Sequence, residues 1–227
     1  MRAERVSIIV PALNEASGIE AMLRPLQAWR TEGHELILVD GGSTDGTPER
    51  ASPWCDRVLT SPPGRALQMN AGARIAGGEV LWFLHADTSA PADALSAMLG
   101  ALDATGRCWG RFDVQLSGDL WPLRWVERLM NLRSCLSGIA TGDQGLFVRR
   151  AAFESIGGFP SIPLMEDIAL SRRLRRLSRP VCLHRRLVTS SRRWETRGVW
   201  RTIVLMWRLR LAYALGADPE ALARRYR

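Results

Sequence analysis

Short apolar runs along this chain alternate with stretches in which apolar residues recur every three or four positions. The apolar runs Val6–Ala12, Glu35–Asp40 and Val80–Leu84 are typical of strands buried on both faces, and a further strand is expected near Arg57–Thr60. The helical spacing between them predicts amphipathic helices, one of which covers Gly64–Ala76. This alternation predicts an α/β fold with a mostly parallel, twisted sheet flanked by helices.

The second half of the chain has a different pattern. Alternation over Arg111–Leu116 predicts a half-exposed strand with Arg111 on its outer face. Another strand is expected over Ala140–Arg149, with polar residues 142–144 in its first half. The remaining expected elements are helices over Pro91–Ala104 and Leu120–Leu136, a helix opening at Glu166-Asp167, a short strand over Val181–Leu183, a long helix over Val199–Leu215 and a short one after Asp218-Pro219.

Charge and composition narrow the class of protein. All 31 basic residues are arginine, which excludes chemistry that depends on a lysine. The net charge of +8 is concentrated at one end, because residues 161–227 contain 16 arginines and 5 acids. This basic end must therefore meet an anionic partner or lie exposed. The chain shows no signal-peptide pattern and no uncharged apolar stretch of about 18 residues, so no spanning helix is expected.

The four cysteines are widely separated in the sequence and form no CxxC pair. They are Cys55, Cys108, Cys135 and Cys182. We therefore expect neither a zinc site nor a disulfide framework, which is typical of proteins from a reducing compartment.

Polar residues follow three of the expected strands at the point where each strand ends. Asn14-Glu15 follows the first strand, Asp40 begins a glycine-rich loop after the second, and His85-Ala86-Asp87 follows the central strand. Open α/β sheets bind ligands at the carboxyl ends of their strands. Asp87 there would suit a divalent cation that also holds a phosphate. Alternatively, Asp87 caps the next helix and His85 is a packed strand-end residue.

Five motifs in order resemble the family-2 glycosyltransferases with the GT-A fold. They are SIIVPALNE, VDGGSTDGT, GRALQMNAG, FLHAD and MEDIALSRRL, and they span most of the chain. The resemblance implies one domain over residues 1–227. Residues 1–90 would form a nucleotide-sugar-binding half, 91–195 an acceptor half and 196–227 the C-terminal basic helices.

The resemblance also implies an activity and a set of site residues. The donor would be a nucleoside-diphosphate sugar, with uridine favoured, and the reaction would be an inverting transfer to an acceptor hydroxyl with Mn²⁺ or Mg²⁺ as the cofactor. Asp87 would bind the cation, and His85 stands where the family motif has its first aspartate. Asp167 would be the general base, with Glu166 beside it. The nucleotide would contact Pro11, Ala12, Leu13, Asn14, Glu15, Asp40, Gly41, Ser43, Asp45, Arg65, Asn70 and Ala86. The acceptor or sugar would contact Gly142, Asp143 and Gln144. His184 could complete the metal shell, and Arg192 and Arg193 with Trp194 could clamp the diphosphate or an acceptor phosphate.

Several of these roles have structural alternatives. Asp40 could shape its own turn, and Asp167 could be a helix N-cap. Arg65, Arg192 and Arg193 could be solvated surface arginines. For two other residues the alternative is favoured, because Asn70 is expected to pack its helix on the sheet and His184 to be exposed beside two arginines.

The function and partners also have competing hypotheses. The chain could bind nucleotide sugars without catalysis. Its last long helix could lie on an anionic membrane and reach a lipid-linked acceptor. We favour a helix packed across the domain or in a homodimer interface, because a helix that is apolar nearly all round is usually buried. No nucleic-acid-binding motif accompanies the charge. The expected location is the cytoplasm, with peripheral contact at the inner membrane face as the alternative.

Overall fold

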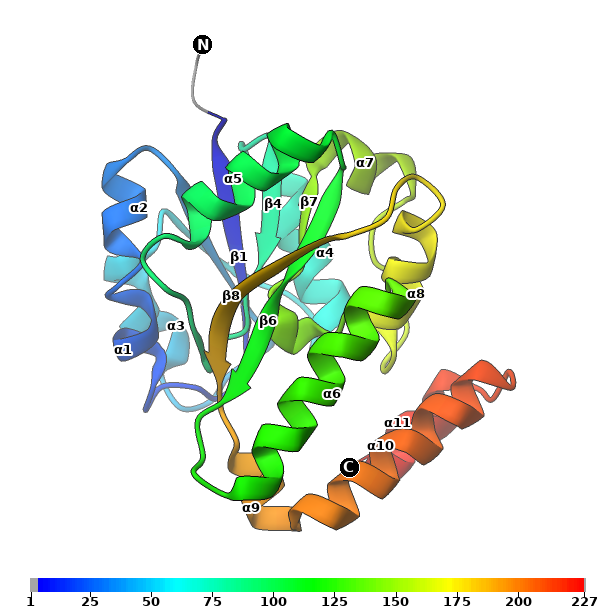
Figure 1. Ribbon diagram of the computed structural model, residues 1–227. Coiled ribbons are helices and arrows are strands. Elements are labelled where there is room, and N and C mark those ends of the chain that lie inside the picture. Colours follow the sequence, from blue (N-terminus) through cyan, green and yellow to red (C-terminus); the bar gives the residue numbers. More distant parts are fainter. Residues whose placement is uncertain (1–3, 227) are drawn as a thin grey trace.

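The computed structural model describes residues 4–226, and these form an eight-stranded sheet with helices on both faces (Figure 1). The strand order is β3-β2-β1-β4-β7-β6-β8-β5. The elements of the first half are β1 Val6–Ala12, α1 Ile19–Leu23, α2 Gln27–Thr31, β2 Glu35–Asp40, α3 Thr47–Ala51, the 3₁₀ turn Ser52–Trp54, β3 Arg57–Thr60, α4 Arg65–Ile75 and β4 Val80–Phe83.

The strands of the first half pair in parallel, as predicted. β1 lies between β2 and β4, and β2 also pairs with β3. Every residue of β1, β2 and β4 is buried, which explains their apolar sequences. Helices α1 and α2 pack on one face of this half and α4 on the other, so both faces of the sheet are covered.

The second half inserts antiparallel strands into the sheet. Its elements are β5 Thr88–Ser89, α5 Ala94–Thr105, β6 Trp109–Leu116, α6 Trp121–Ser137, the 3₁₀ turn Gly142–Gln144, β7 Phe147–Arg149, α7 Arg150–Ser155, α8 Glu166–Leu174, β8 Val181–Thr189, α9 Arg192–Arg197, α10 Val199–Ala214 and α11 Pro219–Tyr226. β7 runs antiparallel to both β4 and β6, whereas β6 and β8 are parallel. The sheet is therefore mixed, and the carboxyl end of β4 lies beside the start of β7.

Two aromatic clusters join the halves across the sheet. On one face the ring of Trp82 lies 5.4 Å from that of Phe112, which in turn packs edge-on against Phe147. On the other face, the rings of Phe83 and Phe159 meet at 4.9 Å. Such aromatic pairs contribute about 0.5–1.5 kcal/mol each beyond their buried area. Aromatic packing therefore adds to the stability of the strand junction at β4.

Three expectations about strands were wrong because tertiary contacts override the local pattern. Arg111, expected on an exposed face, is 1% exposed. Helix α6 covers it, and the guanidinium donates to the carbonyl of Asn131 at 2.9 Å and pairs with Asp113. The strand expected over Ala140–Arg149 begins only at Phe147, because residues 142–144 form a turn. β8 is longer than expected and ends at Thr189.

The cysteine expectation also needs correction. Cys135 on α6 and Cys182 on β8 form a disulfide, with their Cα atoms 5.8 Å apart. Their separation of 47 residues gave no sign of this pairing. Cys55 and Cys108 are free.

The C-terminal helices lie outside the sheet layers and pack on α6 and α8. In Figure 1, α10 and α11 extend below the sheet, beyond α6. Within residues 4–226, no helix combines the length and the apolar character needed to cross a bilayer. α10 is only half buried: Leu209 packs inward while Trp207 is exposed. The expectation of a buried helix therefore holds for one of its faces.

Gly72 offers a test of the fit between α4 and the sheet. A Cβ atom at this position would lie 2.5 Å from Cγ2 of Ile9 and 3.1 Å from Cγ2 of Val39. We expect Gly72→Ala to lower the free energy of unfolding by about 1–3 kcal/mol, since overpacking outweighs the better helix propensity of alanine. The matched control is Gly100→Ala in α5, where no heavy atom lies within 4 Å and where alanine should stabilise the helix. Urea denaturation of both variants checks this, and equal stabilisation by both would contradict the tight packing.

Candidate functional site

Side chains from both halves of the chain line a cleft at the carboxyl ends of β1 and β4. The cleft consists of two adjoining hollows, and five residues line both: Arg65, Asp87, Leu164, Glu166 and Tyr226. The first hollow also contains Pro11, Ala12, Leu13, Glu15, Gly64, Gln68, His85, Ala86 and Pro163. The second also contains Thr141, Gly142, Asp143, Asp167, Thr189, Arg192, Arg193, Trp194, Met206 and Arg210.

Hydrogen bonds between the loops after β1 and β2 fix one wall of the first hollow. Asn14 adopts a left-handed backbone, with φ +55°, a conformation that asparagine tolerates. Its amide N–H donates to Ser43 Oγ at 2.8 Å, and its side-chain oxygen accepts from the Thr44 N–H at 2.9 Å. The Ala16 N–H donates to Asp45 at 2.9 Å. Asn14, Ser43 and Asp45, expected at the nucleotide, therefore join the two loops.

Asp40 accepts hydrogen bonds within its own turn. One carboxylate oxygen accepts from the N–H groups of Gly42 and Ser43, both at 2.9 Å, and the other accepts from Ser43 Oγ at 2.5 Å. The residue is 2% exposed and does not line either hollow. Gly41, its neighbour, lies against the amide of Gln68. Both Asp40 oxygens accept hydrogen bonds from the loop, so Asp40 shapes the rim of the cleft.

Asp87 projects into the cleft from the loop after β4. Its Oδ1 lies 3.4 Å from the hydroxyls of Thr88 and Thr189, which orient the carboxylate. Asp87 is not a helix cap, because Asp93 precedes the first residue of α5. The carboxylate is exposed to both hollows and is free to meet a ligand.

His85 faces the second half of the chain. Its buried ring places Nδ1 3.3 Å from Oδ1 of Asp143. Burial alone would raise the pKa of Asp143, but the hydrogen bond from His85 and the charges of Arg65 and Arg193 lower it. Gly142 permits this contact, since a Cβ there would lie 2.6 Å from Nε2 of His85.

Asp167 occupies the second hollow at the start of α8. The N–H of Gly142 donates to its Oδ2 at 3.0 Å, and the N–H of Ile168 donates to its Oδ1 at 2.7 Å. Met165, which has φ +68°, is the N-cap residue, so the N-cap alternative for Asp167 is wrong. Its carboxylate is held in place by two backbone donors and lines the cleft.

Glu166 lies beside Asp167 in a much drier environment. Burial, together with the nearby charge of Asp167, raises the pKa of Glu166 to about 7. The charge of Asp167 and the burial of Glu166 therefore both oppose ionisation of the Glu166 carboxyl.

Four arginines bring positive charge to the cleft. Arg65 comes from the start of α4, Arg192 and Arg193 from α9, and Arg210 from α10. Arg192 pairs with Glu15 at 3.1 Å, and the Arg193 guanidinium lies 3.9 Å from the ring centroid of Tyr226. Such guanidinium groups are suited to the oxygens of a diphosphate. Trp194 lines the second hollow and packs against α6.

Three further candidates lie away from the cleft lining. Gln144, expected to face acceptor or sugar, is fully buried and donates to Ser134 Oγ at 2.9 Å, because the turn directs its side chain beneath α6. Asn70 packs as favoured, donating to the Phe159 carbonyl at 2.8 Å. His184 is exposed, also as favoured, and bonds to Asp113 at 3.0 Å.

Sequence reasoning missed several residues of the lining. Gln68 donates from its buried amide to the carbonyls of Ala12 and Val39, both at 2.8 Å, and so fixes the floor of the first hollow. A polar residue on the buried side of a helix was the available signal for Gln68. Tyr226, Met206 and Arg210 arrive from the C-terminal helices and carry no local signal of a site.

The oxygen-bearing side chains of the cleft suit a hard cation that takes most of its ligands from phosphate and water. Within residues 4–226, no three His, Cys, Asp or Glu side chains gather closely enough to enclose a metal ion. Asp87 offers one oriented carboxylate, and the Thr88 and Thr189 hydroxyls support it. Mg²⁺ and Mn²⁺ bound with a nucleotide use one or two carboxylates in this way, so the residues fit such an ion.

Comparisons with known proteins identify the family of the chain. The family model described as "Glycosyl transferase family 2" matches residues 7–157. A protein named PGL/p-HBAD biosynthesis glycosyltransferase from Mycobacterium bovis is 31% identical over 171 residues, which cover 70% of this chain and 64% of that protein. The chain thus spans a little under two thirds of the length of this relative.

Solved structures show the same fold. PcManGT, a mannosyltransferase from Pyrobaculum calidifontis in complex with GDP-Man and Mn²⁺, matches with a TM-score of 0.67 and 22% identity, covering 98% of this chain and 69% of that one. Glucosyl-3-phosphoglycerate synthase from Mycobacterium tuberculosis, in complex with Mn²⁺, UDP and glucosyl-3-phosphoglycerate, matches with a TM-score of 0.62 and 22% identity. This match covers 82% of this chain and 71% of that one. The predicted GT-A fold is confirmed.

Glu166 predicts a pH-dependent stability. Its carboxyl titrates near 4.5 when unfolded and near 7 in the fold, so the unfolded chain loses the proton first as pH rises. The free energy of unfolding should therefore fall between these two pH values and then level off. Glu166→Gln should remove this loss, making the variant more stable than the parent by roughly 1–3 kcal/mol at pH 8 and equal to it at pH 4. Urea denaturation with a chelator present measures it. Glu154→Gln, which alters an exposed carboxyl, is the control. If Glu166→Gln raised the free energy of unfolding equally at pH 4 and pH 8, the raised pKa of Glu166 would not be the cause.

Proposed function

Because the chain belongs to glycosyl transferase family 2, we propose that it is an inverting, metal-dependent glycosyltransferase that moves a sugar from a uridine diphosphate donor to an acceptor hydroxyl. The observation that carries the proposal is that Asp87 and Asp167, 80 positions apart in the sequence, line the same arginine-rich cleft. The nature of the donor and of the acceptor that the whole protein uses is part of this proposal.

The donor would lie in the first hollow, with its diphosphate toward the shared residues. Pro11, Ala12 and Leu13 offer backbone and apolar surface for the nucleoside. Arg65 stands between the two hollows and is suited to the diphosphate. Two structural neighbours hold a nucleotide with Mn²⁺, one with UDP and the other with GDP-Man, which supports a nucleotide-sugar donor of either base.

Asp87 would hold the divalent cation together with the donor phosphates. When bound, such an ion neutralises the negative charge that develops on the leaving diphosphate. Thr88 and Thr189 would keep the Asp87 carboxylate in one orientation. His85 would hold the Asp143 carboxylate in position, since its Nδ1 is directed to that carboxylate.

The transfer itself would be a single displacement. Asp167 would accept the proton of the acceptor hydroxyl as its oxygen forms a bond to the anomeric carbon. The bond from that carbon to the phosphate oxygen breaks, and the nucleoside diphosphate leaves with the electron pair. The Gly142 N–H would hold the Asp167 carboxylate toward the acceptor. A general base in this position contributes about 10²–10⁴-fold to the rate.

Substitution of the two aspartates separates cation binding from proton transfer. We expect Asp167→Asn to lower Mn²⁺-dependent turnover of a UDP-sugar by about 10²–10⁴-fold while leaving UDP binding intact. Asp87→Asn should lower turnover at least as much and also weaken the Mn²⁺-dependent binding of UDP. Donor hydrolysis by water serves as the assay, and calorimetry measures the binding.

Asp119→Asn is the matched control, because this exposed carboxylate lies in the loop before α6 and outside the cleft lining. It should change neither turnover nor binding. Failure of the parent protein to turn over any UDP- or GDP-sugar, with UDP binding that is indifferent to Asp167→Asn, would favour the competing non-catalytic function.

A further inference from the structure

Helices α6 and α10 carry two rows of exposed apolar side chains. The row on α6 is Trp121, Trp125, Leu129, Leu132 and Leu136. The row on α10 is Trp200, Val204, Trp207 and Leu211, and the C-cap residue Leu215 continues it. These ten residues are between 55 and 80% exposed. On a helix with 3.6 residues per turn, the five positions of each row fall within an arc of about 80°. We call the two rows together the apolar face.

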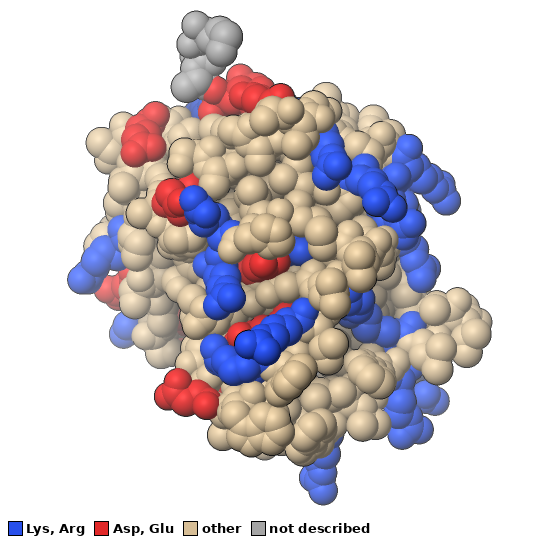
Figure 2. All heavy atoms as spheres, viewed as in Figure 1, with Lys and Arg blue, Asp and Glu red and all other residues tan. Residues whose placement is uncertain are grey.

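The two helices are neighbours, and their rows lie on the sides that do not pack. Leu123 and Val126 of α6 pack against Val199 of α10, with Met130 and Ile203 beside them. Helix α10 is apolar on the side that packs against the protein and also on the side that is exposed. This explains why its sequence is apolar nearly all round. In Figure 2 the lower part of the molecule, over α6, α9 and α10, is largely tan. Large exposed apolar side chains gathered on two neighbouring helices are typical of interaction sites.

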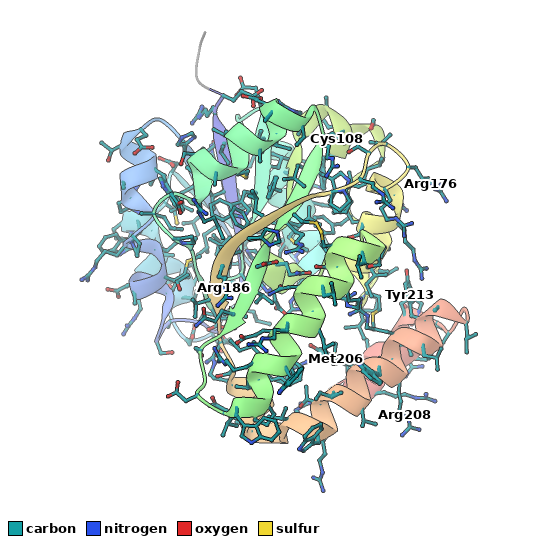
Figure 3. The ribbon with its side chains drawn as sticks, viewed as in Figure 1. Cys108, Arg176, Arg186, Met206, Arg208 and Tyr213 are labelled. Atoms are coloured by element: carbon teal, nitrogen blue, oxygen red, sulfur yellow. A yellow bond between two sulfur atoms is a disulfide. The ribbon has the colours of Figure 1, made fainter. Side chains whose placement is uncertain are left out.

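Arginines surround the apolar face. The Arg128 guanidinium lies 5.6 Å from the ring centroid of Trp125. Arg201, Arg208 and Arg225 line a groove between α10 and α11 that also contains Trp200. In Figure 3, Arg208 leaves α10 on the side away from the body of the molecule, whereas Tyr213 is directed toward α8.

Acidic residues do little to offset this charge. The sequence of α10 contains no acid, and the only acid of α6, Glu127, is buried and pairs with Arg124 at 3.1 Å. Asp119 lies just before α6, Glu195 is on α9, Asp218 lies just before α11, and Glu220 is on α11. The apolar face therefore has a positive rim.

We propose that the apolar face binds the surface of an anionic lipid bilayer. Tryptophan rings partition to the boundary between headgroups and acyl chains, and the leucines beside them can enter the acyl region. The arginines would meet lipid phosphates, with each one near the surface adding to the attraction. The apolar rows and the positive rim are both complementary to such a membrane.

The same charges disfavour a second copy of the chain as the occupant. A two-fold dimer would place this patch against itself, so the arginine rims of the two copies would face each other. Like charges brought together at a partly desolvated interface repel. Lipid phosphates neutralise the rim, whereas a second copy doubles its charge.

The position of α10 connects this surface with the cleft. Met206 and Arg210 line the cleft, while Trp207 and Leu211 belong to the apolar face. A bilayer bound to this face would therefore lie about one helix diameter, roughly 10 Å, from the cleft. As a consequence that rests on the proposed function, the acceptor would be a hydroxyl compound linked to a lipid.

Vesicle co-sedimentation tests the docking without any assay of transfer, so its outcome is independent of the proposed activity. The probes are vesicles of phosphatidylcholine with and without phosphatidylglycerol. We expect the full chain to bind the anionic vesicles at least about tenfold more tightly, with binding that weakens in high salt. The double variant Trp125→Ser/Trp207→Ser should reduce this binding about tenfold or more.

Two further variants complete the design. Arg201→Gln/Arg208→Gln should reduce the preference for anionic over neutral vesicles. Leu177→Ser, which alters an exposed leucine beyond the end of α8, should leave binding unchanged. All altered side chains are exposed, so each variant should melt like the parent. Equal binding by the parent and the tryptophan variant would overturn the proposal. So would a dimer in sedimentation that the same variant dissociates, which would assign the face to a second copy.

Discussion

The antiparallel pairing of β4 with β7 is the constraint on which the cleft depends. The pairing places Trp82 opposite Phe147, and the Phe83 N–H donates to the Leu146 carbonyl at 2.9 Å. Because the strands run in opposite directions, the loop that leaves β4 lies beside the turn that enters β7. His85 can therefore meet Asp143, and Asp167 can accept from the backbone of that same turn. If this strand were parallel to β4, the turn that precedes it would lie at the opposite end of the strands, away from the loop that leaves β4.

The charges of the cleft follow from this meeting of loops. Asp87, Asp143 and Asp167 come from three separate segments, and Glu166 shares their space. Arginines from α4, α9 and α10 surround them. Without lysine in the chain, guanidinium groups supply all the permanent positive charge of the cleft. The raised pKa of Glu166 shows the cost of crowding carboxylates where water is scarce.

The C-terminal helices contribute both to the cleft and to the exposed apolar surface. α10 contributes to the cleft with one side and exposes tryptophan and leucine with the other. Tyr226, at the end of α11, returns to the cleft and stacks with Arg193. Hence the end of the chain both completes a wall of the site and carries part of the apolar face.

The sequence by itself determined the strands of the first half, the positions of the polar loops and the family. Each of these depends on a local pattern, because a strand buried on both faces must be apolar and a loop at its end is free to be polar. Asp87, Arg65 and Asp167 were accordingly found from the sequence as candidates that line the cleft. Only the tertiary structure decided the burial of Arg111, the Cys135–Cys182 disulfide, the inward turn of Gln144 and the arrival of Tyr226 in the cleft. These features depend on which distant element packs against a residue, and the spacing of residues along one segment carries no record of that partner.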